Sequence, residues 1–370
     1  MKKKLTLLGF AFLAMELVCG QNVSPNPLPD NNPLRDHTDS VIQEKVKAFF
    51  DQAKAPGLII GISRAGQRQY YCYGYADPAT KKMFGPKTIG EIGSITKTFT
   101  ANLLLQLSQK GLLQVNDPVT RFIPENSNDT LLQKIILADL ASQVSGLPRL
   151  PANLDKVKGY KAAQPYAHYS REDLYSFLSS LKTLHPGTYN YSNLGFGLLG
   201  TVLENVTHST YSSLVQQYIF HPLGMNNSYV DMVEKHADTA TGFLNGKPVD
   251  YWLFDCLGGA GSIKSNAEDM LTYLEACLSS PEPAFGNAVR EALQQRAVVG
   301  PGMHIGYAWH SIDNLPHPAW WHNGGTYGFS SFAAIEPQSK TAIILFSNTF
   351  NVNNQLDLLS VELLILLTGK

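Results

Sequence analysis

The chain has 370 residues, of which 44% are hydrophobic, so it is long enough to bury a large core. Its 29 basic and 30 acidic residues give a formal net charge of −1 at pH 7. This balance argues against the strongly basic surface with which proteins bind nucleic acids.

The first twenty residues have the features of a targeting segment. A basic MKKK start is followed by the apolar run LTLLGFAFLAMELV and then by Cys19 and Gly20. This order is typical of a secretory signal peptide, and the apolar run is too short for a membrane span. We therefore predict a signal peptide over 1–20 and a periplasmic protein with no stable membrane span in the mature chain. Lipid attachment at Cys19 is the alternative, which the preceding Val18 and Glu16 disfavour because a lipoprotein signal has small and apolar residues there.

The next stretch, 21–36, is rich in Pro and Asn and is predicted to be a flexible linker. After it the chain has only Cys72, Cys256 and Cys277, an odd number with no short spacing. This pattern argues against a disulfide framework and against a zinc site. The ten histidines show no H-E-x-x-H motif and no paired metal spacing, so we expect neither a metal nor another cofactor.

Hydrophobic periodicity predicts the elements in chain order. A helix is followed by a β-hairpin and a buried helix that stops at Gly111, then by a mostly helical middle region, three strands and a last helix. These elements are expected at 40–54, 55–77, 95–110, 117–250, 318–349 and 354–369. Strands near both ends of the chain indicate one sheet assembled from both ends, with the helical region inserted between them.

This order predicts an α/β fold of the α+β type in a single domain over 37–370. The sheet part is expected at about 37–93 and 255–370, and the helical part at about 94–254.

The stretch GEIGSITKTF places Ser94 and Lys97 three residues apart at the head of the predicted buried helix. Residues at i and i+3 share a helix face, so the hydroxyl and the amine can meet. The N–H groups of a helix N-terminus can stabilise an oxyanion, and burial lowers the pKa of a lysine so that it can accept a proton. The alternative is that Ser94 is an ordinary N-cap.

Two later stretches add to this pair. GTYNYSNLGFGLLG contains Tyr191 and Asn193, and WWHNGGTYGFS contains His322. Taken alone, Tyr191 is equally a core aromatic residue and His322 a structural histidine. The order Ser-x-x-Lys, Tyr-x-Asn and His-x-Gly resembles the penicillin-recognising serine hydrolases. The tyrosine places the resemblance with the branch of class C β-lactamases, DD-peptidases, D-amino acid peptidases and family VIII carboxylesterases.

The resemblance covers roughly 37–370 and implies a β-lactamase/transpeptidase-like fold, with an antiparallel sheet flanked by the N- and C-terminal helices. It also implies roles for individual residues. Ser94 would be the acylated nucleophile, and Lys97 and Tyr191 would share the role of general base. Asn193 would orient the substrate, and the backbone N–H groups of Ser94 and Gly325 would form the oxyanion hole.

The third motif departs from the class C pattern. Class C β-lactamases usually have Lys-Thr-Gly where this chain has His322, Asn323 and Gly324. The resemblance places all three in substrate binding, with His322 beside a substrate carboxylate. A histidine pKa near 6.5 predicts tighter binding of anionic substrates when the ring is protonated. Arg149 and Leu150 stand where β-lactamases often have glutamine, which disfavours efficient cephalosporin hydrolysis.

The sequence therefore predicts a secreted serine hydrolase that cleaves an amide or ester bond through a Ser94 acyl-enzyme. Peptidoglycan-type peptides, β-lactams and small esters are the candidate substrates, and their order is left open. A dedicated class C-like β-lactamase is one alternative. A non-catalytic penicillin-binding sensor is another, which is disfavoured because no transmembrane segment follows 1–20. The absence of G-x-S-x-G excludes a hydrolase with the nucleophile elbow of the α/β-hydrolases.

Overall fold

The computed structural model describes residues 29–30, 32–232 and 237–369. The predicted signal peptide at 1–20 lies outside these residues, as does most of the predicted linker.

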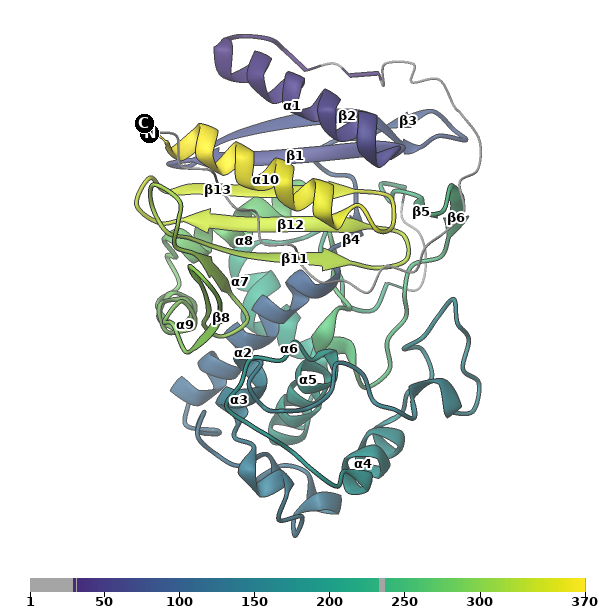
Figure 1. The fold of residues 1–370 in the computed structure, drawn as a ribbon, viewed down its shortest axis with the longest axis vertical. Helices are drawn as coiled ribbons and strands as arrows, with labels where there is room; N and C mark the ends of the chain where they lie inside the picture. Colours follow the sequence, from purple (N-terminus) through teal and green to yellow (C-terminus); the bar gives the residue numbers. More distant parts are fainter. Residues whose placement is uncertain (1–28, 31, 233–236, 370) are drawn as a thin grey trace.

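One antiparallel sheet of nine strands forms the upper half of the molecule in Figure 1. Across the sheet the strands are, in order, β3 (Lys82–Met83), β2 (Gln67–Asp77), β1 (Gly57–Arg64), β13 (Thr341–Ser347), β12 (Ser330–Glu336), β11 (Ala319–Gly325), β10 (His310–Ile312), β9 (Met303–Ile305) and β8 (Ala297–Gly300). The pairing of β1 with β13 joins the N-terminal hairpin to the C-terminal strands. The prediction of one sheet built from both ends of the chain is confirmed.

The central strands are buried on both faces, which explains their unbroken apolar sequence. In β1 the residues from Gly57 to Ser63 are all buried, and in β13 every residue is buried. A strand covered on both faces has no need for alternating polar residues. The tight turn after β1 uses Ala65 and Gly66, both with positive φ, which is the geometry of a two-residue hairpin loop.

Helices α1 (His37–Ala53) and α10 (Asn353–Thr368) cover the outer face of the sheet side by side (Figure 1). Their apolar stripes, which include Ile42, Val46 and Leu363, pack against alternate side chains of β1, β12 and β13 in one core cluster. The predicted flanking of the sheet by the terminal helices is confirmed.

The other face of the sheet packs on α8 and on the mainly helical region below it (Figure 1). The helices of this side are α2 (Thr96–Gln109), α3 (Leu137–Ala141), α4 (Arg171–Ser180), α5 (Asn193–Thr207), α6 (Tyr211–Val215), α7 (His221–Leu223), α8 (Ala267–Leu278) and α9 (Pro283–Ala292). Helix α2 lies at the centre, where Phe99 stacks on Tyr273 with ring centroids 3.8 Å apart. Every residue of α2 from Thr96 to Leu107 is buried, as its apolar sequence predicts.

Shorter elements complete the fold. Two small antiparallel pairs lie beside the main sheet, namely β4 (Gly90–Glu91) with β7 (Lys264–Ser265) and β5 (Gly242–Leu244) with β6 (Lys247–Val249). Single helical turns occur at η1 (Gly93–Ile95), η2 (Val119–Arg121), η3 (Pro124–Asn126), η4 (Leu132–Lys134), η5 (Leu154–Lys156), η6 (Gln216–Phe220) and η7 (Gly258–Ala260).

The described part of the predicted linker lies along β2. Asp30 forms a β-bridge with Tyr73. The Asn32 amide donates to the Cys72 carbonyl at 3.0 Å and accepts from the Cys72 N–H at 2.8 Å. Within the ranges that the structure describes, every helix is too short or too polar to cross a membrane.

Candidate active site

Ser94 lies in the η1 turn, between the short strand β4 and the start of α2. Gly93 just before it has φ of +50°, and a Cβ there would lie 2.7 Å from the Gly325 nitrogen at the end of β11. Glycine is therefore required for this close approach. The N-cap position of α2 is Ile95, and no side-chain capping bond is made there. The alternative that Ser94 is an ordinary N-cap is wrong.

Lys97 contacts Ser94 directly from the first turn of α2. Its Nζ lies 2.9 Å from Ser94 Oγ and donates to the Ala260 carbonyl at 2.7 Å. The side chain is fully buried. Burial, assisted by the positive charge of Arg149, lowers the pKa of the Lys97 amine well below its usual value. This shift favours the neutral amine, which can accept the Ser94 hydroxyl proton.

Tyr191 lies beside the same two residues, just before α5. Lys97 Nζ is 4.9 Å from the centroid of the Tyr191 ring. Removal from water raises the pKa of Tyr191 to about 12, although its hydrogen bond with Ser94 and the charge of Arg149 oppose the rise. The phenol is therefore protonated in the resting enzyme, and Lys97 is the group that is ready to accept a proton.

The start of α5 fixes Asn193 at the same site. Ser192, expected from the sequence only to pack, is the N-cap, and its Oγ accepts from the Gly195 N–H at 2.8 Å. The Asn193 side chain forms a hydrogen bond with Tyr166. Its Oδ1 is buried and has no hydrogen-bond partner among the described residues. Buried polar atoms are nearly always paired, so an unpaired buried oxygen suggests that its partner is a bound ligand or water.

The third motif approaches Ser94 with its backbone. A Cβ on Gly324 would lie 2.0 Å from the Ile92 carbonyl oxygen, so only glycine allows β11 to pack this closely on the segment that leads to Ser94. Asn323 Nδ2 donates to Asp357 Oδ2 on α10 at 2.8 Å. Successive side chains of a strand point to opposite faces, so the Asn323 side chain faces the outer helix layer rather than Ser94. The predicted contact of Asn323 with a substrate would therefore have to be made by its backbone.

His322 lies on the inner face of β11 and is buried. Its ring centroid is 5.3 Å from that of His310, and His310 Nε2 lies 2.9 Å from the Tyr189 hydroxyl. Burial lowers the pKa of His322 well below 6.5, and the neighbouring His310 and Lys97 act in the same direction. Burial also lowers the pKa of His310 to about 4. Both shifts favour the neutral rings, so they do not support the tighter binding of anionic substrates that a protonated His322 would give.

The predicted site residues are thus gathered at one place from η1, α2, the start of α5 with the segment before it, and β11; they are Ser94, Lys97, Tyr191, Asn193 and Gly325. The model of the Beta-lactamase family matches residues 39–364. The chain belongs to the Beta-lactamase family. The members that it resembles are serine hydrolases, so it is an enzyme of that class, as the sequence predicts, and the sensor alternative loses its support.

The relatives of this chain include proteins named beta-lactamase and a protein named carboxypeptidase/endopeptidase. A beta-lactamase of Yersinia enterocolitica is 24% identical over 348 residues, which cover 84% of this chain and 86% of that protein. The D-alanyl-D-alanine-carboxypeptidase/endopeptidase AmpH of Escherichia coli (strain K12) is 26% identical over 246 residues, which cover 65% of this chain and 62% of that protein.

Solved structures of Beta-lactamase family proteins confirm the predicted fold. The crystal structure of a beta-lactamase/D-alanine carboxypeptidase from Pseudomonas syringae matches with a TM-score of 0.79 at 24% identity, covering 89% of this chain and 99% of that one. A class C beta lactamase from Rhodobacter sphaeroides matches with a TM-score of 0.77 at 22% identity and the same coverage.

Glu91 is a residue of this Beta-lactamase family chain that the sequence reasoning missed. It is buried, and its carboxylate accepts from the Trp252 N–H and from the Thr326 hydroxyl, both at 2.7 Å. Burial raises the pKa of Glu91 to about 7, although Lys264 opposes the rise. Glu91 thereby ties the segment before Ser94 to the residue that follows Gly325. A carboxylate within an otherwise apolar GEIGS stretch was the signal available in the sequence.

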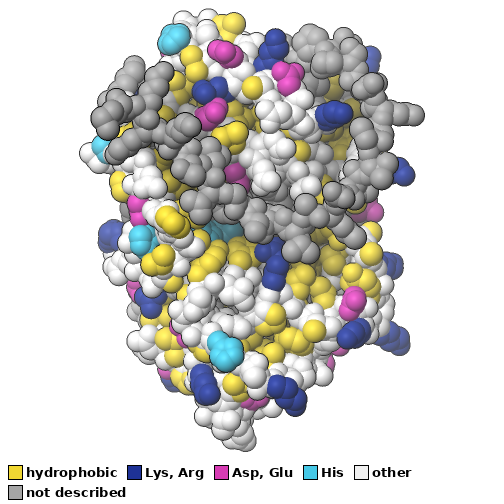
Figure 2. All heavy atoms as spheres, in the orientation of Figure 1, with side chains coloured by type: hydrophobic (Ala, Val, Ile, Leu, Met, Phe, Trp, Pro, Cys, Tyr) yellow, Lys and Arg dark blue, Asp and Glu magenta, His cyan; other side chains and the backbone are white. Residues whose placement is uncertain are grey.

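The face of the molecule shown in Figure 2 is mixed in character. Hydrophobic side chains gather across the middle of the face shown in Figure 2, with His and Lys or Arg side chains among them. In the described ranges, no three His, Cys, Asp or Glu side chains are grouped so that they could hold a metal ion.

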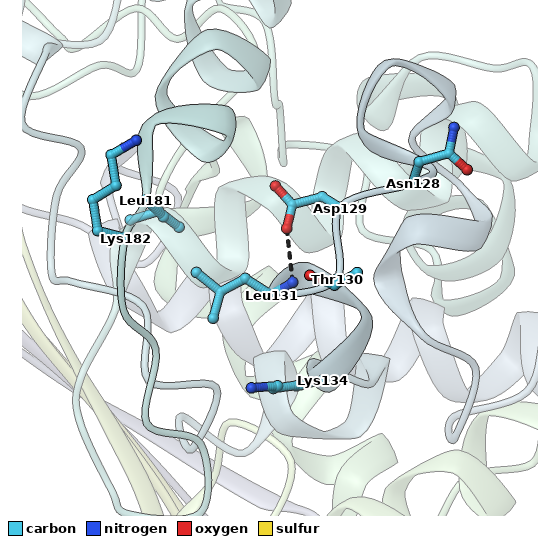
Figure 3. Close-up of a pocket in the computed structure, with 7 residues that line it drawn as sticks. All are labelled: Asn128, Asp129, Thr130, Leu131, Lys134, Leu181 and Lys182. Carbon is cyan, nitrogen blue, oxygen red and sulfur yellow. Dashed lines mark hydrogen bonds between the residues drawn. The ribbon is translucent and has the colours of Figure 1, made fainter.

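A separate pocket of about 490 Å³ opens in the helical part of the molecule. There Asp129 accepts a hydrogen bond from the Leu131 N–H at 2.9 Å (Figure 3). None of the predicted site residues lines it; its lining is Asn128, Asp129, Thr130, Leu131, Lys134, Leu181 and Lys182.

Proposed function

We propose that this protein hydrolyses amide or ester bonds through an acyl-enzyme on Ser94, with peptides that end in D-amino acids as its first substrate class. The observation that carries the proposal is the 2.9 Å contact between Ser94 Oγ and a buried Lys97 amine of lowered pKa. A serine next to a neutral amine has the proton acceptor that a nucleophilic hydroxyl requires.

In the acylation step, Lys97 Nζ accepts the Ser94 proton while Oγ attacks the substrate carbonyl. The charge that develops on the carbonyl oxygen is stabilised by the N–H groups of Ser94 and Gly325, whose segments are in close contact through Gly93. The protonated Tyr191 phenol gives its proton to the leaving group, and the Lys97 ammonium returns a proton to Tyr191.

In the deacylation step, a water molecule attacks the Ser94 ester. Lys97 and Tyr191, in contact with Ser94, accept the water proton and return it to Ser94 Oγ. Asn193 Oδ1, buried and without a described partner, would accept a hydrogen bond from an N–H group of the acyl chain. The relay thus ends in its starting state.

A class C-like β-lactamase is the second candidate function. It is favoured by relatives named beta-lactamase, of which the one from Escherichia coli (strain K12) is 25% identical over 348 residues. The histidine in the third motif favours the peptidase. Neither function requires a cofactor or a nucleic-acid partner.

The test is a panel of a D-Ala-D-Ala peptide, nitrocefin and p-nitrophenyl acetate, with mass spectrometry of the trapped protein. We expect turnover of the peptide and an acyl mass on the fragment that contains Ser94. Ser94→Ala should lower turnover by about 10³-fold or more. Ser360→Ala, a buried serine on α10, is the matched control and should retain activity. Activity of Ser94→Ala above about 1% of the wild type would remove Ser94 from the mechanism.

We also propose that the protein acts in the periplasm. The basic start and short apolar run of 1–20 support this location. Recovery of the protein in a periplasmic fraction with Gln21 as its first residue is the expected result. A mature protein that keeps 1–20 in the cytoplasm would contradict it.

A further inference from the structure

Arg149 is held at the active site by its own backbone. Its carbonyl accepts the N–H groups of Asn193 at 3.0 Å and Leu194 at 3.2 Å, in the first turn of α5. Ser192 Oγ donates to the carbonyl of the preceding Pro148 at 2.7 Å. The position of Arg149 is therefore fixed relative to the Tyr191-x-Asn193 motif, although the two segments are about 40 residues apart in the sequence.

The side chain of Arg149 is exposed, unlike the groups beneath it. Its guanidinium carbon lies 4.9 Å from the centroid of the Tyr191 ring, which is also the distance of Lys97 Nζ from that ring. The Arg149 charge adds to the burial that lowers the pKa of Lys97, and it opposes the burial that raises the pKa values of Tyr191 and Tyr189.

Burial disfavours the positive charge on the other basic groups described around Ser94, namely Lys97, His310 and His322. An arginine remains protonated at any physiological pH. Arg149 therefore supplies positive charge at a site where the third motif does not.

We propose that Arg149 binds a carboxylate of the substrate and selects acyl compounds that carry one near the scissile bond. A planar guanidinium matches a carboxylate with two parallel hydrogen bonds. This proposal rests on the proposed function, because it takes Ser94 as the group that the selected substrate acylates. It assigns to the helical part of the chain the anion recognition that the sequence placed at His322.

The test compares two peptides with the same scissile bond, an acyl-D-Ala-D-Ala with a free carboxylate and its C-terminal amide. We expect the wild type to prefer the free acid in kcat/KM. Arg149→Ala should lower that preference about tenfold or more, the usual effect of losing a charged hydrogen bond. Arg149→Lys should restore part of it.

Arg296→Ala is the matched control. Arg296 is also an exposed arginine over a tyrosine ring, with its guanidinium carbon 4.4 Å from the centroid of Tyr307. This variant should leave the preference unchanged. An equal loss of activity on both peptides in Arg149→Ala would overturn the proposal, because it would mean that Arg149 acts only on the proton relay.

Binding separates this proposal from the proposed function. In the Ser94→Ala background, calorimetry measures the affinity of both peptides with and without Arg149→Ala. A loss of affinity confined to the free acid supports Arg149 even if no acyl-enzyme is ever trapped. Equal affinities for the acid and the amide with Arg149 present would overturn the role of Arg149 while leaving Ser94 acylation intact.

Discussion

The nucleophile segment and the third-motif strand meet at Gly93 and Gly325, but they contribute different parts of the site. The first segment supplies reactive side chains, with Ser94 and Lys97 2.9 Å apart. The second supplies backbone, because Gly324 and Gly325 have no side chain and Asn323 faces α10. A short motif can therefore be required because its glycines have no side chain, and not only for the side chains that it carries.

Burial lowers the pKa of a basic residue both on the nucleophile segment and on β11, but the consequences differ. On the nucleophile side it lowers the pKa of Lys97 and so creates a proton acceptor. On the β11 side it lowers the pKa of His322 and so removes a positive charge. The same physical effect therefore favours a proton acceptor at Lys97 and disfavours a positive charge at His322.

The largest expected effect breaks the nucleophile side. Lys97→Ala and Tyr191→Phe should each lower kcat/KM by about 10²-fold or more, because each removes a group of the proton relay. The double variant should be little worse than the poorer single one, since residues that act as a unit are not additive. Steady-state kinetics of the three variants measures this. Losses that multiply would show two independent roles.

A smaller effect tests whether β11 contributes only backbone. Gly324→Ala would place a Cβ 2.0 Å from the Ile92 carbonyl, so the strand must shift. We expect kcat to fall about tenfold and stability to fall by about 1–3 kcal/mol, the usual cost of overpacking. Thermal unfolding and kinetics on one preparation measure both.

Asn323→Ala is the control on the same strand. It loses the bond to Asp357 but leaves the inner face intact. Its kcat should remain within about twofold of the wild type while the melting temperature falls. A large loss of kcat with unchanged stability would return the Asn323 side chain to the substrate site.

The smallest effect concerns the pH dependence of stability. Burial holds the pKa of His310 at about 4 and that of His322 well below 6.5. Between about pH 6.5 and these lower values the unfolded chain binds more protons than the folded one, so stability falls as pH falls. His322→Gln should make that decline shallower from pH 7 to 5 in thermal unfolding. The same slope in variant and wild type would mean that His322 takes up its proton in the folded protein near its ordinary pKa.

The features that depend on the spacing of residues along the chain could be predicted from the sequence. The apolar run after Ser94 predicts a buried helix, and the i, i+3 spacing predicts the contact with Lys97. The strands at both ends predict one sheet assembled from both ends, and in the structure β1 and β13 form the pair that joins them. These features are local or follow from periodicity, which a single sequence records well.

Other features depend on which groups meet after folding. Nothing in the sequence near Asn323 indicates that α10 supplies Asp357, so the outward direction of that side chain could not be predicted. The same holds for His310, which lies on a neighbouring strand and disfavours protonation of His322. Protonation states follow from burial and from such neighbours, and neither is visible in a motif.

The contact between Gly93 and Gly325 also bears on when the enzyme becomes active. The chain is made from its N-terminus, so Ser94 and Lys97 are synthesised long before β11. Until β11 docks on the segment before Ser94, Gly325 does not lie beside Gly93, so the site that we propose lacks one of its two N–H donors. We therefore expect Ser94 to be inactive in a nascent or partly folded chain. Hydrolytic activity then serves as a direct readout that the last strands have joined the first, and a folding study of this protein can follow it without any added label.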